Sequence, residues 1–490
     1  MGEIQQQTLK SVKWSTIERF SIQGVTFLLG IIVARLLTPA DYGLVGMVSI
    51  FFGISQTLID SGFNNALVRK PDRTEDDFYT AFYFSLGISI ILAITLSLCS
   101  PLIADFFHQP ILRQIVPIMS LNLIIGTIGI IPGTKIYIAL DFKIDAKINF
   151  ICAVSSGVFG LILAYYGFGV WALVWQGLCC SSLRMILLWI LRPSKLRLRF
   201  SGKSFHQLFG YGSKLMISGL INNVYSEITT IVIGKFYSPA SLGYYSRGTE
   251  LAIMPVRLTT NIVTRVTFPI LARIQSDDER LIRVYRTYIS LIMMVVVFGC
   301  LLIGSLARPW ILGFLTAKWE SSIIFAQIFV FAIVFDPISS LNLNLLQVKG
   351  RSDLFLRLEI IKKIIGLCIL LASIPLGVVA ICISKVIYTQ IAMIINTYYT
   401  GKLFGLGYWQ QWKDFSPYFL YAGLACIPSI ALAYFCPWYI FSLILGGVVS
   451  TILYIWILKM SKDTVFHDYI APMLQKYINK LPKRLRFNIL

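Results

Sequence analysis

The segment IIVARLLTPADYG (residues 31–43) returns two hundred residues later as IVIGKFYSPASLG (residues 231–243). Each copy is an apolar run that carries one cation and ends in a hydroxyl residue, proline and alanine. A hydroxyl residue followed by proline is typical of a helix start, because the hydroxyl caps the helix and proline fits its first turn. Each copy therefore predicts the end of one apolar helix and the beginning of the next.

The composition of the chain is that of an integral membrane protein. Its 490 residues are 57% hydrophobic and only 13% charged, and the mean hydropathy is +0.75. A soluble domain carries about a quarter charged residues, so this chain has too little charge to cover a water-facing surface. The start MGEIQQQTLKSVKWSTIERF lacks the apolar core and cleavage site of a signal peptide, so we expect the first apolar segment to be retained.

The apolar runs are numerous enough to cross a membrane many times. A transmembrane helix needs about 20 apolar residues. By that rule we predict an all-α polytopic membrane protein with about fourteen transmembrane helices. The predicted spans lie near residues 14–37, 42–63, 79–103, 114–138, 147–167, 169–191, 210–236, 241–268, 285–307, 321–346, 355–376, 378–400, 416–436 and 438–459.

Lysine and arginine are distributed unevenly between the two sides of these spans. Connections on one side, together with the tail, hold most of the cations, whereas the other side holds only Arg35, Arg113, Lys235, Arg308 and Lys318. Cytoplasmic loops of membrane proteins carry an excess of lysine and arginine, so both termini are predicted to be cytoplasmic. Topology explains most of the net charge of +20, and no nucleic-acid partner is expected.

The two copies of the repeated segment are separated by an even number of predicted spans and so have the same orientation. Their matched register over thirteen positions favours a parallel duplication of about six helices; the alternative is a chance similarity of two short turns. Transporters are often built from such repeats. The predicted domains are a six-helix lobe (1–191), a basic cytoplasmic linker (192–209), a second six-helix lobe (210–402), two additional helices (403–460) and a basic cytoplasmic tail (461–490).

The eighth predicted span carries polar side chains spaced 3, 7, 4 and 4 residues apart, which places them on one helical face. They are Arg247, Glu250, Arg257, Asn261 and Arg265. An ionisable group at the centre of a membrane helix costs about 2.5 kcal/mol or more, so it usually faces a cavity or a partner. Arginines lining a cavity suit phosphate oxygens. The alternative is that Glu250 neutralises Arg247 or Arg257 in a pair that only packs the helix.

Other predicted spans carry polar residues as well. Gln56, Asp60 and Asn64 recur every fourth residue on the second span, and Asn222 lies in a similar series on the seventh. We interpret Asn64, Asn222 and Arg19 as further cavity residues, with interhelical hydrogen bonding as the alternative for the amides. Four carboxylates are candidates for coupling to a proton or cation, with structural ion pairs as the alternative. They are Glu18, Asp60, Glu227 and Asp336.

Motifs of enzymes and metal sites are missing from the sequence. HExxH, P-loop, GxGxxG and nucleophile-elbow patterns do not occur, and the nine cysteines include no CxxC pair. No predicted loop exceeds about twenty residues, which disfavours a membrane glycosyltransferase or polymerase with a large catalytic loop. We therefore expect a transporter without catalytic residues, metal or cofactor, apart from a coupling proton or sodium ion.

Four segments resemble the bacterial polysaccharide exporters of the Wzx type, in particular the colanic acid and teichuronic acid exporter branch. The segments are KWSTI (13–17), ITTIVIGKFYSPASLGYYSRG (228–248), TRVTFPILARIQSDDERL (264–281) and AKWESSI (317–323). These exporters belong to the multidrug/oligosaccharidyl-lipid/polysaccharide superfamily, together with the lipid II flippase and the multidrug and toxin extrusion antiporters. The similarity runs from residue 13 to about residue 400.

The resemblance implies two six-helix lobes around a hydrophilic cavity, in the bacterial inner membrane. Its cargo would be oligosaccharide units on undecaprenyl pyrophosphate, flipped to the periplasmic leaflet. Polysaccharide polymerases and glycosyltransferases would be its partners. Arg247 and Arg257 would hold the pyrophosphate. The first lobe offers only Arg19, with Asp60 where a cation is expected, which argues against a symmetric phosphate clamp. A multidrug antiporter on the same scaffold is the alternative, and Asp60 and Glu227 would suit its cationic substrates.

Overall fold

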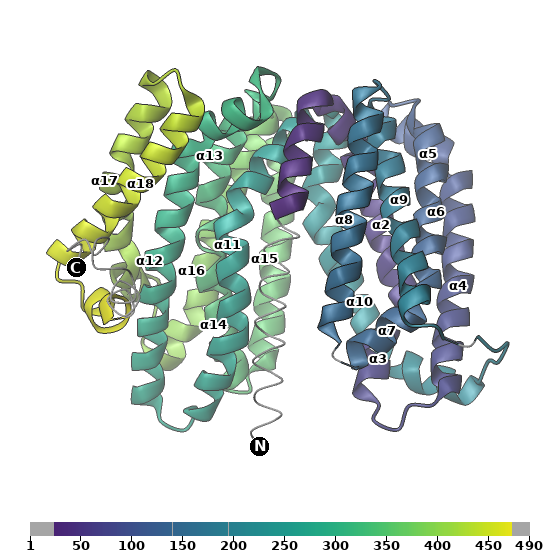
Figure 1. Cartoon of the computed structure of the whole chain (residues 1–490). Coiled ribbons are helices and arrows are strands. Elements are labelled where there is room, and N and C mark those ends of the chain that lie inside the picture. The colour runs from purple at the N-terminus through teal and green to yellow at the C-terminus, as the bar shows by residue number, and fades with distance from the viewer. Residues whose placement is uncertain (1–23, 140, 195, 473–490) are drawn as a thin grey trace, which may run out of the picture. The chain divides into compact units, whose positions relative to one another are not determined.

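The computed structural model describes residues 24–139, 141–194 and 196–472 (Figure 1). These residues form helices joined by short connections, and no strand occurs among them, which confirms the predicted all-α fold. The chain divides into two compact units, Met1–Gly243 and Tyr244–Leu490, called unit 1 and unit 2 below. Glu18 and Arg19 lie outside the described residues, as does the side chain of Asn261.

Unit 1 is a bundle of helices that begins with Gly24–Leu36 and ends in the first turn of α11 (Pro239–Arg273). Between them lie α2 (Pro39–Asp60), α3 (Phe63–Arg69), α4 (Glu75–Leu98), α5 (Ser100–Phe107), α6 (Leu112–Ile128), α7 (Ile130–Ile138), α8 (Phe142–Tyr165), α9 (Val170–Leu191) and α10 (Gly202–Phe236). Helices α6 and α7 are bent by 47° against each other at Gly129. Figure 1 shows α3 and α7 at the same end of this unit.

Unit 2 contains the remainder of α11 and the helices that follow it. These are α12 (Asp278–Trp310), α13 (Ser322–Ile333), α14 (Asp336–Val348), α15 (Ser352–Ser373), α16 (Val378–Phe404), α17 (Tyr408–Phe435) and α18 (Tyr439–Met460). Helices α17 and α18, the two additional helices of the sequence, pack against α12. The ring of Tyr454 stacks on Phe298 at 4.3 Å, and its hydroxyl donates to the Met294 carbonyl at 2.7 Å, which fixes α18 on α12.

Nine helices of the described chain are long and apolar enough to cross a membrane, or ten if the bent pair α6–α7 is one span. The protein is therefore a multi-pass membrane protein. Helices α10, α11 and α15 occupy predicted spans as well but are too polar to belong to the nine. Because a polar helix crosses lipid only when its polar face meets protein or water, these three helices need covered or hydrated faces. The count of fourteen spans stays a prediction.

The two copies of the repeated segment fold in the same way. In the first, the Thr38 hydroxyl accepts a hydrogen bond from the Asp41 amide at 3.3 Å, and in the second the Ser238 hydroxyl accepts one from the Ser241 amide at 3.2 Å. Pro39 and Pro239 are the first residues of α2 and α11. The capped helix start predicted for both copies is confirmed, whereas the helix before the second copy, α10, is more polar than expected.

Helix α10, which the sequence assigns to the second repeat, packs within unit 1 along α2. At one end of this contact, a β-carbon on Gly62 would lie 2.6 Å from the Gly212 carbonyl oxygen. Farther along, the Asn223 amide donates to the Thr57 hydroxyl and the Gly53 carbonyl, and a β-carbon on Gly219 would lie 3.0 Å from the Thr57 methyl. Small residues therefore bring the two backbones together over several turns.

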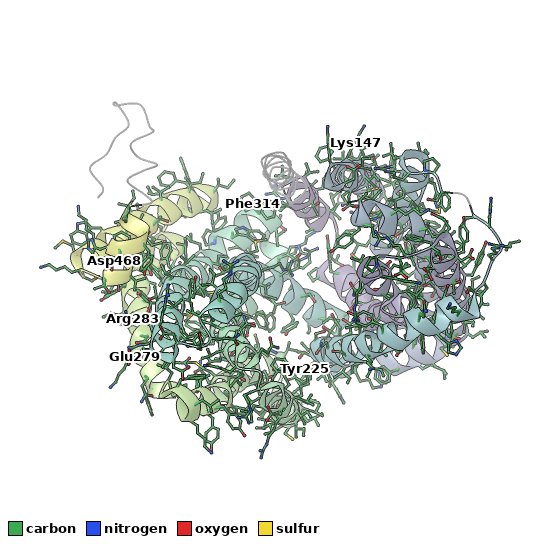
Figure 2. All side chains as sticks on the ribbon, turned by 90° about the horizontal axis from the view of Figure 1, so that it is seen from below. Lys147, Tyr225, Glu279, Arg283, Phe314 and Asp468 are labelled. Atoms are coloured by element: carbon green, nitrogen blue, oxygen red, sulfur yellow. The ribbon has the colours of Figure 1, made fainter. Side chains whose placement is uncertain are left out.

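Three charged side chains mark the outer edges of the two units. In the end-on view of Figure 2, Lys147 lies at the rim of unit 1, and Glu279 and Arg283 lie at the rim of unit 2. All three side chains are exposed. The connections that begin at Arg69, Ile138 and Leu191 run at one end of unit 1, where the predicted cytoplasmic cations lie.

Candidate functional site

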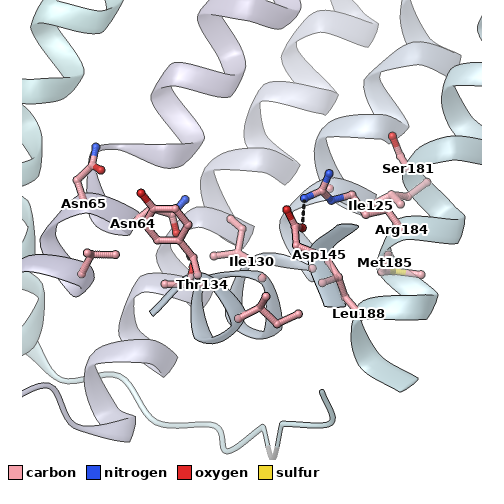
Figure 3. Close-up of a pocket in the computed structure, with 16 residues that line it drawn as sticks. Asn64, Asn65, Ile125, Ile130, Thr134, Asp145, Ser181, Arg184, Met185 and Leu188 are labelled. Carbon is pink, nitrogen blue, oxygen red and sulfur yellow. Dashed lines mark hydrogen bonds and ion pairs between the residues drawn. The ribbon is translucent and has the colours of Figure 1, made fainter. Parts of the chain in front are cut away.

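A pocket of about 530 Å³ opens in unit 1 among α3, α6, α7, α8 and α9 (Figure 3). We call it the four-helix pocket, because α6 and α7 form one bent span. Its polar lining consists of Asn64, Asn65, Thr134, Asp145, Ser181 and Arg184. The bend at Gly129 creates one wall, in which Gly126, Gly129 and Gly133 face the pocket without side chains. The remaining lining is mostly apolar, with Ile130 and Leu188 among it.

Asn64 holds the wall of the pocket on the α3 side. Its amide nitrogen donates to Asp60 Oδ1 at 2.6 Å, and its amide oxygen accepts from the Thr134 hydroxyl at 2.6 Å. Asp60 is the last residue of α2, and Thr134 lies on α7. The side chain of Asn64 therefore ties the end of α2 to the bent span by two hydrogen bonds, and its orientation is fixed.

Arg184 on α9 faces Asp145 and Asn149 on α8. Its guanidinium lies 3.3 Å from Asp145 Oδ1 and donates to Asn149 Oδ1 at 2.7 Å. Asn149 in turn donates to Asp145 Oδ2 at 3.1 Å. The Arg184 and Asp145 side chains remain 49% and 39% exposed, so the pair is open to the pocket rather than enclosed by packing. Figure 3 shows both side chains on the pocket wall.

A second hollow, of about 430 Å³, runs between α2, α3 and α10 and is called the α2–α10 groove below. The predicted series Gln56, Asp60 and Asn64 lines it, opposite Gly219 and Asn223 of α10. Asn64 and Asn65 line the groove as well as the four-helix pocket. The two hollows therefore flank α3, and the predicted polar face of α2 lies at their common border.

Three ion pairs lie at the end of unit 1 that holds α3 and α7. Lys135 pairs with Glu75 at 2.8 Å, Arg192 with Asp141 at 2.8 Å, and Lys70 with Asp77 at 2.9 Å. These ion pairs join the ends of neighbouring helices outside the pocket lining. They leave Arg184 and Asp145 as the two charged residues among those that line the pocket.

In unit 2, the predicted cationic face lies on α11. Arg247 pairs with Glu250 at 2.7 Å; the Arg247 side chain is 22% exposed and that of Glu250 57% exposed. Arg257 is exposed. The two arginines share a helix, as predicted, and Arg247 has a carboxylate partner.

Asp336 is the first residue of α14 and lies at the break between α13 and α14. It is exposed, whereas Val334, Phe335 and Pro337 on either side of it are buried. The positive charges of Lys385 on α16 and Lys362 on α15 act on this carboxylate, and Lys362 also pairs with Glu359. A coupling cation would bind this carboxylate only in competition with the positive charges of the two lysines. The cluster therefore also fits a structural ion network.

The sequence patterns indicated some of the residues that line the two hollows and did not indicate others. Asn222 is exposed, and it is the adjacent Asn223 whose amide bonds α2; Glu227 lies half-buried on the same helix. Arg184, Asp145 and Thr134 were not singled out. Arg184 can be identified from the sequence, since it is a cation inside the predicted span 169–191. The rule that an ionisable group within a membrane helix usually faces a cavity or a partner applies to it as to Arg257.

Comparison with solved structures identifies the fold of this protein. The structure matches the lipid II flippase MurJ in an inward closed conformation with a TM-score of 0.72 at 14% identity, over 92% of this chain and 99% of MurJ. It matches an inward-facing MATE multidrug transporter of the MOP superfamily with a TM-score of 0.57 at 19% identity, over 79% of this chain and 97% of that one. The fold is therefore the one shared by MurJ and the MATE transporters.

Sequence comparison then gives the family. The family model described as "Polysaccharide biosynthesis protein" matches residues 32–324, and the chain belongs to this family. Teichuronic acid biosynthesis protein TuaB of Bacillus subtilis is 24% identical over 72% of this chain and 74% of its own length. Lipopolysaccharide biosynthesis protein WzxC of Escherichia coli is 23% identical over 80% of each chain. The resemblance to Wzx-type exporters is confirmed.

Proposed function

We propose that the protein is a lipid-linked oligosaccharide flippase. It moves saccharide units on undecaprenyl pyrophosphate from the cytoplasmic to the periplasmic leaflet, for assembly of a surface polysaccharide such as O-antigen, capsule or exopolysaccharide. The names of the relatives support this cargo, since they include a succinoglycan biosynthesis transport protein of Rhizobium meliloti, 23% identical over 63% of each chain. The bacterial inner membrane and cytoplasmic termini follow from the same proposal.

The observation that carries the proposal is a pair of hollows with polar lining in an otherwise apolar bundle. The four-helix pocket and the α2–α10 groove place Asn64, Asp145 and Arg184 inside helices that pass through lipid. Polar groups in such helices are costly unless they face water, a partner or a cargo. A saccharide headgroup, which cannot enter lipid by itself, is a cargo that needs such an interior.

Transport then proceeds by alternating access without a covalent step. The headgroup crosses through the polar interior while the polyprenyl tail stays in lipid. Arg257, Arg247 and, in the first lobe, Arg19 hold the pyrophosphate, with Asn222 and Asn261 as further polar contacts. Glu18, Asp60, Glu227 and Asp336 remain the candidates for a coupling proton or sodium ion, and no other cofactor is required. Glycosyltransferases act before the transfer, and a polysaccharide polymerase acts after it.

The proposal is tested by deleting the protein in its host. Lipid-linked repeat units should accumulate on the cytoplasmic leaflet, and surface polysaccharide should be lost. The rival antiporter predicts instead that overexpression raises drug resistance while the surface polysaccharide of the deletion strain is unchanged. Unchanged polysaccharide together with unchanged precursor levels would rule out the flippase.

A further inference from the structure

We propose that the four-helix pocket of unit 1 binds the sugar of the lipid-linked cargo rather than its pyrophosphate. The proposal rests on the proposed function and deepens it, because it separates two parts of one ligand. The pocket supplies an array of uncharged hydrogen-bonding groups around a single balanced ion pair. The pocket therefore contributes to affinity for the cargo through hydrogen bonds to the hydroxyl groups of the sugar.

The charge balance of the pocket indicates which part of the cargo it binds, the sugar or the pyrophosphate. The charged lining residues of the pocket are Arg184 and Asp145, and their formal charges cancel. A pyrophosphate needs an excess of cations over carboxylates, which Arg247 and Arg257 with Glu250 supply on α11 and this pocket does not. Asp145, 39% exposed toward the pocket, would repel a phosphate brought to Arg184. A neutral, hydroxylated ring meets no such repulsion.

The polar lining has the chemistry to bind hydroxyl groups. Asn65 and Ser181 supply both donors and acceptors, Arg184 supplies donors only, and Asp145 supplies acceptors only. Each hydroxyl of a sugar is at once a donor and an acceptor, so it can bridge such groups. Asn64 is already bonded to Asp60 and Thr134, which fixes one side of the array before a ligand arrives.

The size and walls of the pocket fit a ring rather than an ion. Its volume of about 530 Å³ falls in the range of about 300–1,000 Å³ that small-molecule sites occupy. Gly126 and Gly133 expose backbone on one wall, and a β-carbon on Gly126 would meet no atom within 4 Å. Tyr137, which is 58% exposed, offers an aromatic face for the C–H side of a sugar ring.

A structural role is the competing explanation for the Arg184–Asp145 pair. Exposed ion pairs contribute little to stability, about 0–1 kcal/mol. The chain offers a matched control, since Arg192 and Asp141 form a second ion pair between α9 and the start of α8, at 2.8 Å and outside the pocket lining. Substitution of either arginine by glutamine should leave a folded protein, so binding can be compared directly.

The test uses purified full-length protein in lipid nanodiscs and two kinds of probe. One probe is undecaprenyl pyrophosphate without a sugar; the others carry a single glucose, galactose or N-acetylglucosamine. Arg184→Gln should weaken binding of the best sugar-bearing lipid about tenfold and leave binding of the bare lipid unchanged. Arg192→Gln should behave as the unsubstituted protein with every probe.

A steric variant provides an independent measurement. Gly126→Leu adds a side chain to the pocket lining at a position where a β-carbon meets no atom within 4 Å, and it should also lower affinity for the sugar-bearing lipid alone. Gly177→Leu, where a β-carbon is equally free of contacts but lies outside the pocket lining, should not. Equal weakening of bare and sugar-bearing lipid by Arg184→Gln would overturn the proposal in favour of a phosphate site. No selective effect of either pocket variant, or no preference of the unsubstituted protein for any sugar, would also overturn it.

The same preparation separates this proposal from the proposed function. Suppose that the unsubstituted protein translocates a sugar-bearing lipid in vesicles, and that the pocket variants also translocate it and bind it with unchanged affinity. Only the pocket assignment is then wrong. If the unsubstituted protein binds and translocates none of the probes and the deletion strain keeps its polysaccharide, the flippase proposal itself fails.

Discussion

A β-carbon on Gly43 would overlap the carbonyl oxygen of Pro239, and a β-carbon on Gly243 would overlap that of Pro39. The two contacts are reciprocal, because each repeated segment places its glycine on the proline of the other. The last position of both repeated segments is therefore restricted to glycine by the backbone of the partner copy. The repeated segments are not only alike in sequence; they meet.

Alanine at either glycine should loosen this contact. Because the β-carbon would meet a backbone carbonyl rather than a flexible side chain, Gly43→Ala and Gly243→Ala should each destabilise the protein by about 1–3 kcal/mol. Thermal unfolding in detergent measures this effect. Gly30→Ala is the control, since a β-carbon there has no atom within 4 Å, and it should be neutral or slightly stabilising. Equal melting temperatures for all three variants would contradict the packing described.

A covalent link between α2 and α10 should stop transport. Alternating access requires helices to change partners, and α10 belongs by sequence to the second repeat although it packs on α2 in this structure. The pair Thr57→Cys and Gly219→Cys lies in contact and should form a disulfide under oxidation. Transport should fall to background and return after reduction, while each single variant stays active. Full activity of the cross-linked protein would show that transport does not require the α2–α10 contact to open.

Arg257 should be required for transport at unchanged expression. If it supplies charged hydrogen bonds to a pyrophosphate, Arg257→Ala removes a contact worth a factor of about ten to a hundred in affinity, and Arg257→Lys should restore part of it. Arg113→Ala is the control, since Arg113 pairs with Asp105 at 2.9 Å on an exposed surface. Surface polysaccharide in a complemented deletion strain gives the readout. Normal export by Arg257→Ala would remove this residue from the site.

The cluster at the α13–α14 break should show energetic coupling. Asp336→Asn leaves Lys385 without its compensating charge, whereas Asp336→Asn with Lys385→Met removes both charges. A double-mutant cycle on thermal unfolding should therefore give a coupling free energy of about 0.5–3 kcal/mol. Asp353→Asn, which breaks an exposed pair with Arg351, should change stability by less than about 0.5 kcal/mol. Strictly additive effects would show that Asp336 and Lys385 do not interact.

Local sequence patterns predicted the helices and their caps, because these depend on neighbouring residues. The helix start at Thr38–Pro39 and its counterpart at Ser238–Pro239 could be identified from hydroxyl and proline alone. The reciprocal contact of Gly43 and Gly243 could not, since it joins segments two hundred residues apart and a single sequence does not state which segments meet.

The polar site was predicted only in part for the same reason. The spacing of Gln56 and Asp60 indicated one polar face of α2, because four residues make about one helical turn, and both line the α2–α10 groove together with Asn64 of α3. Asn222 and Asn223 are adjacent and chemically identical, so periodicity could not decide which of them turns toward α2. The four-helix pocket depends on the 47° bend between α6 and α7, which brings a glycine-rich wall to face Arg184.

Translocation in reconstituted vesicles tests the flippase proposal most directly. Vesicles containing the purified protein and undecaprenyl pyrophosphate with a fluorescent group on its sugar are exposed to a membrane-impermeant reductant under an imposed membrane potential. We predict that fluorescence of the inner-leaflet pool is lost as well as that of the outer, and that vesicles with Arg257→Ala protein retain it. An inner-leaflet pool that stays protected with the unsubstituted protein, as in protein-free vesicles, would contradict the flippase function.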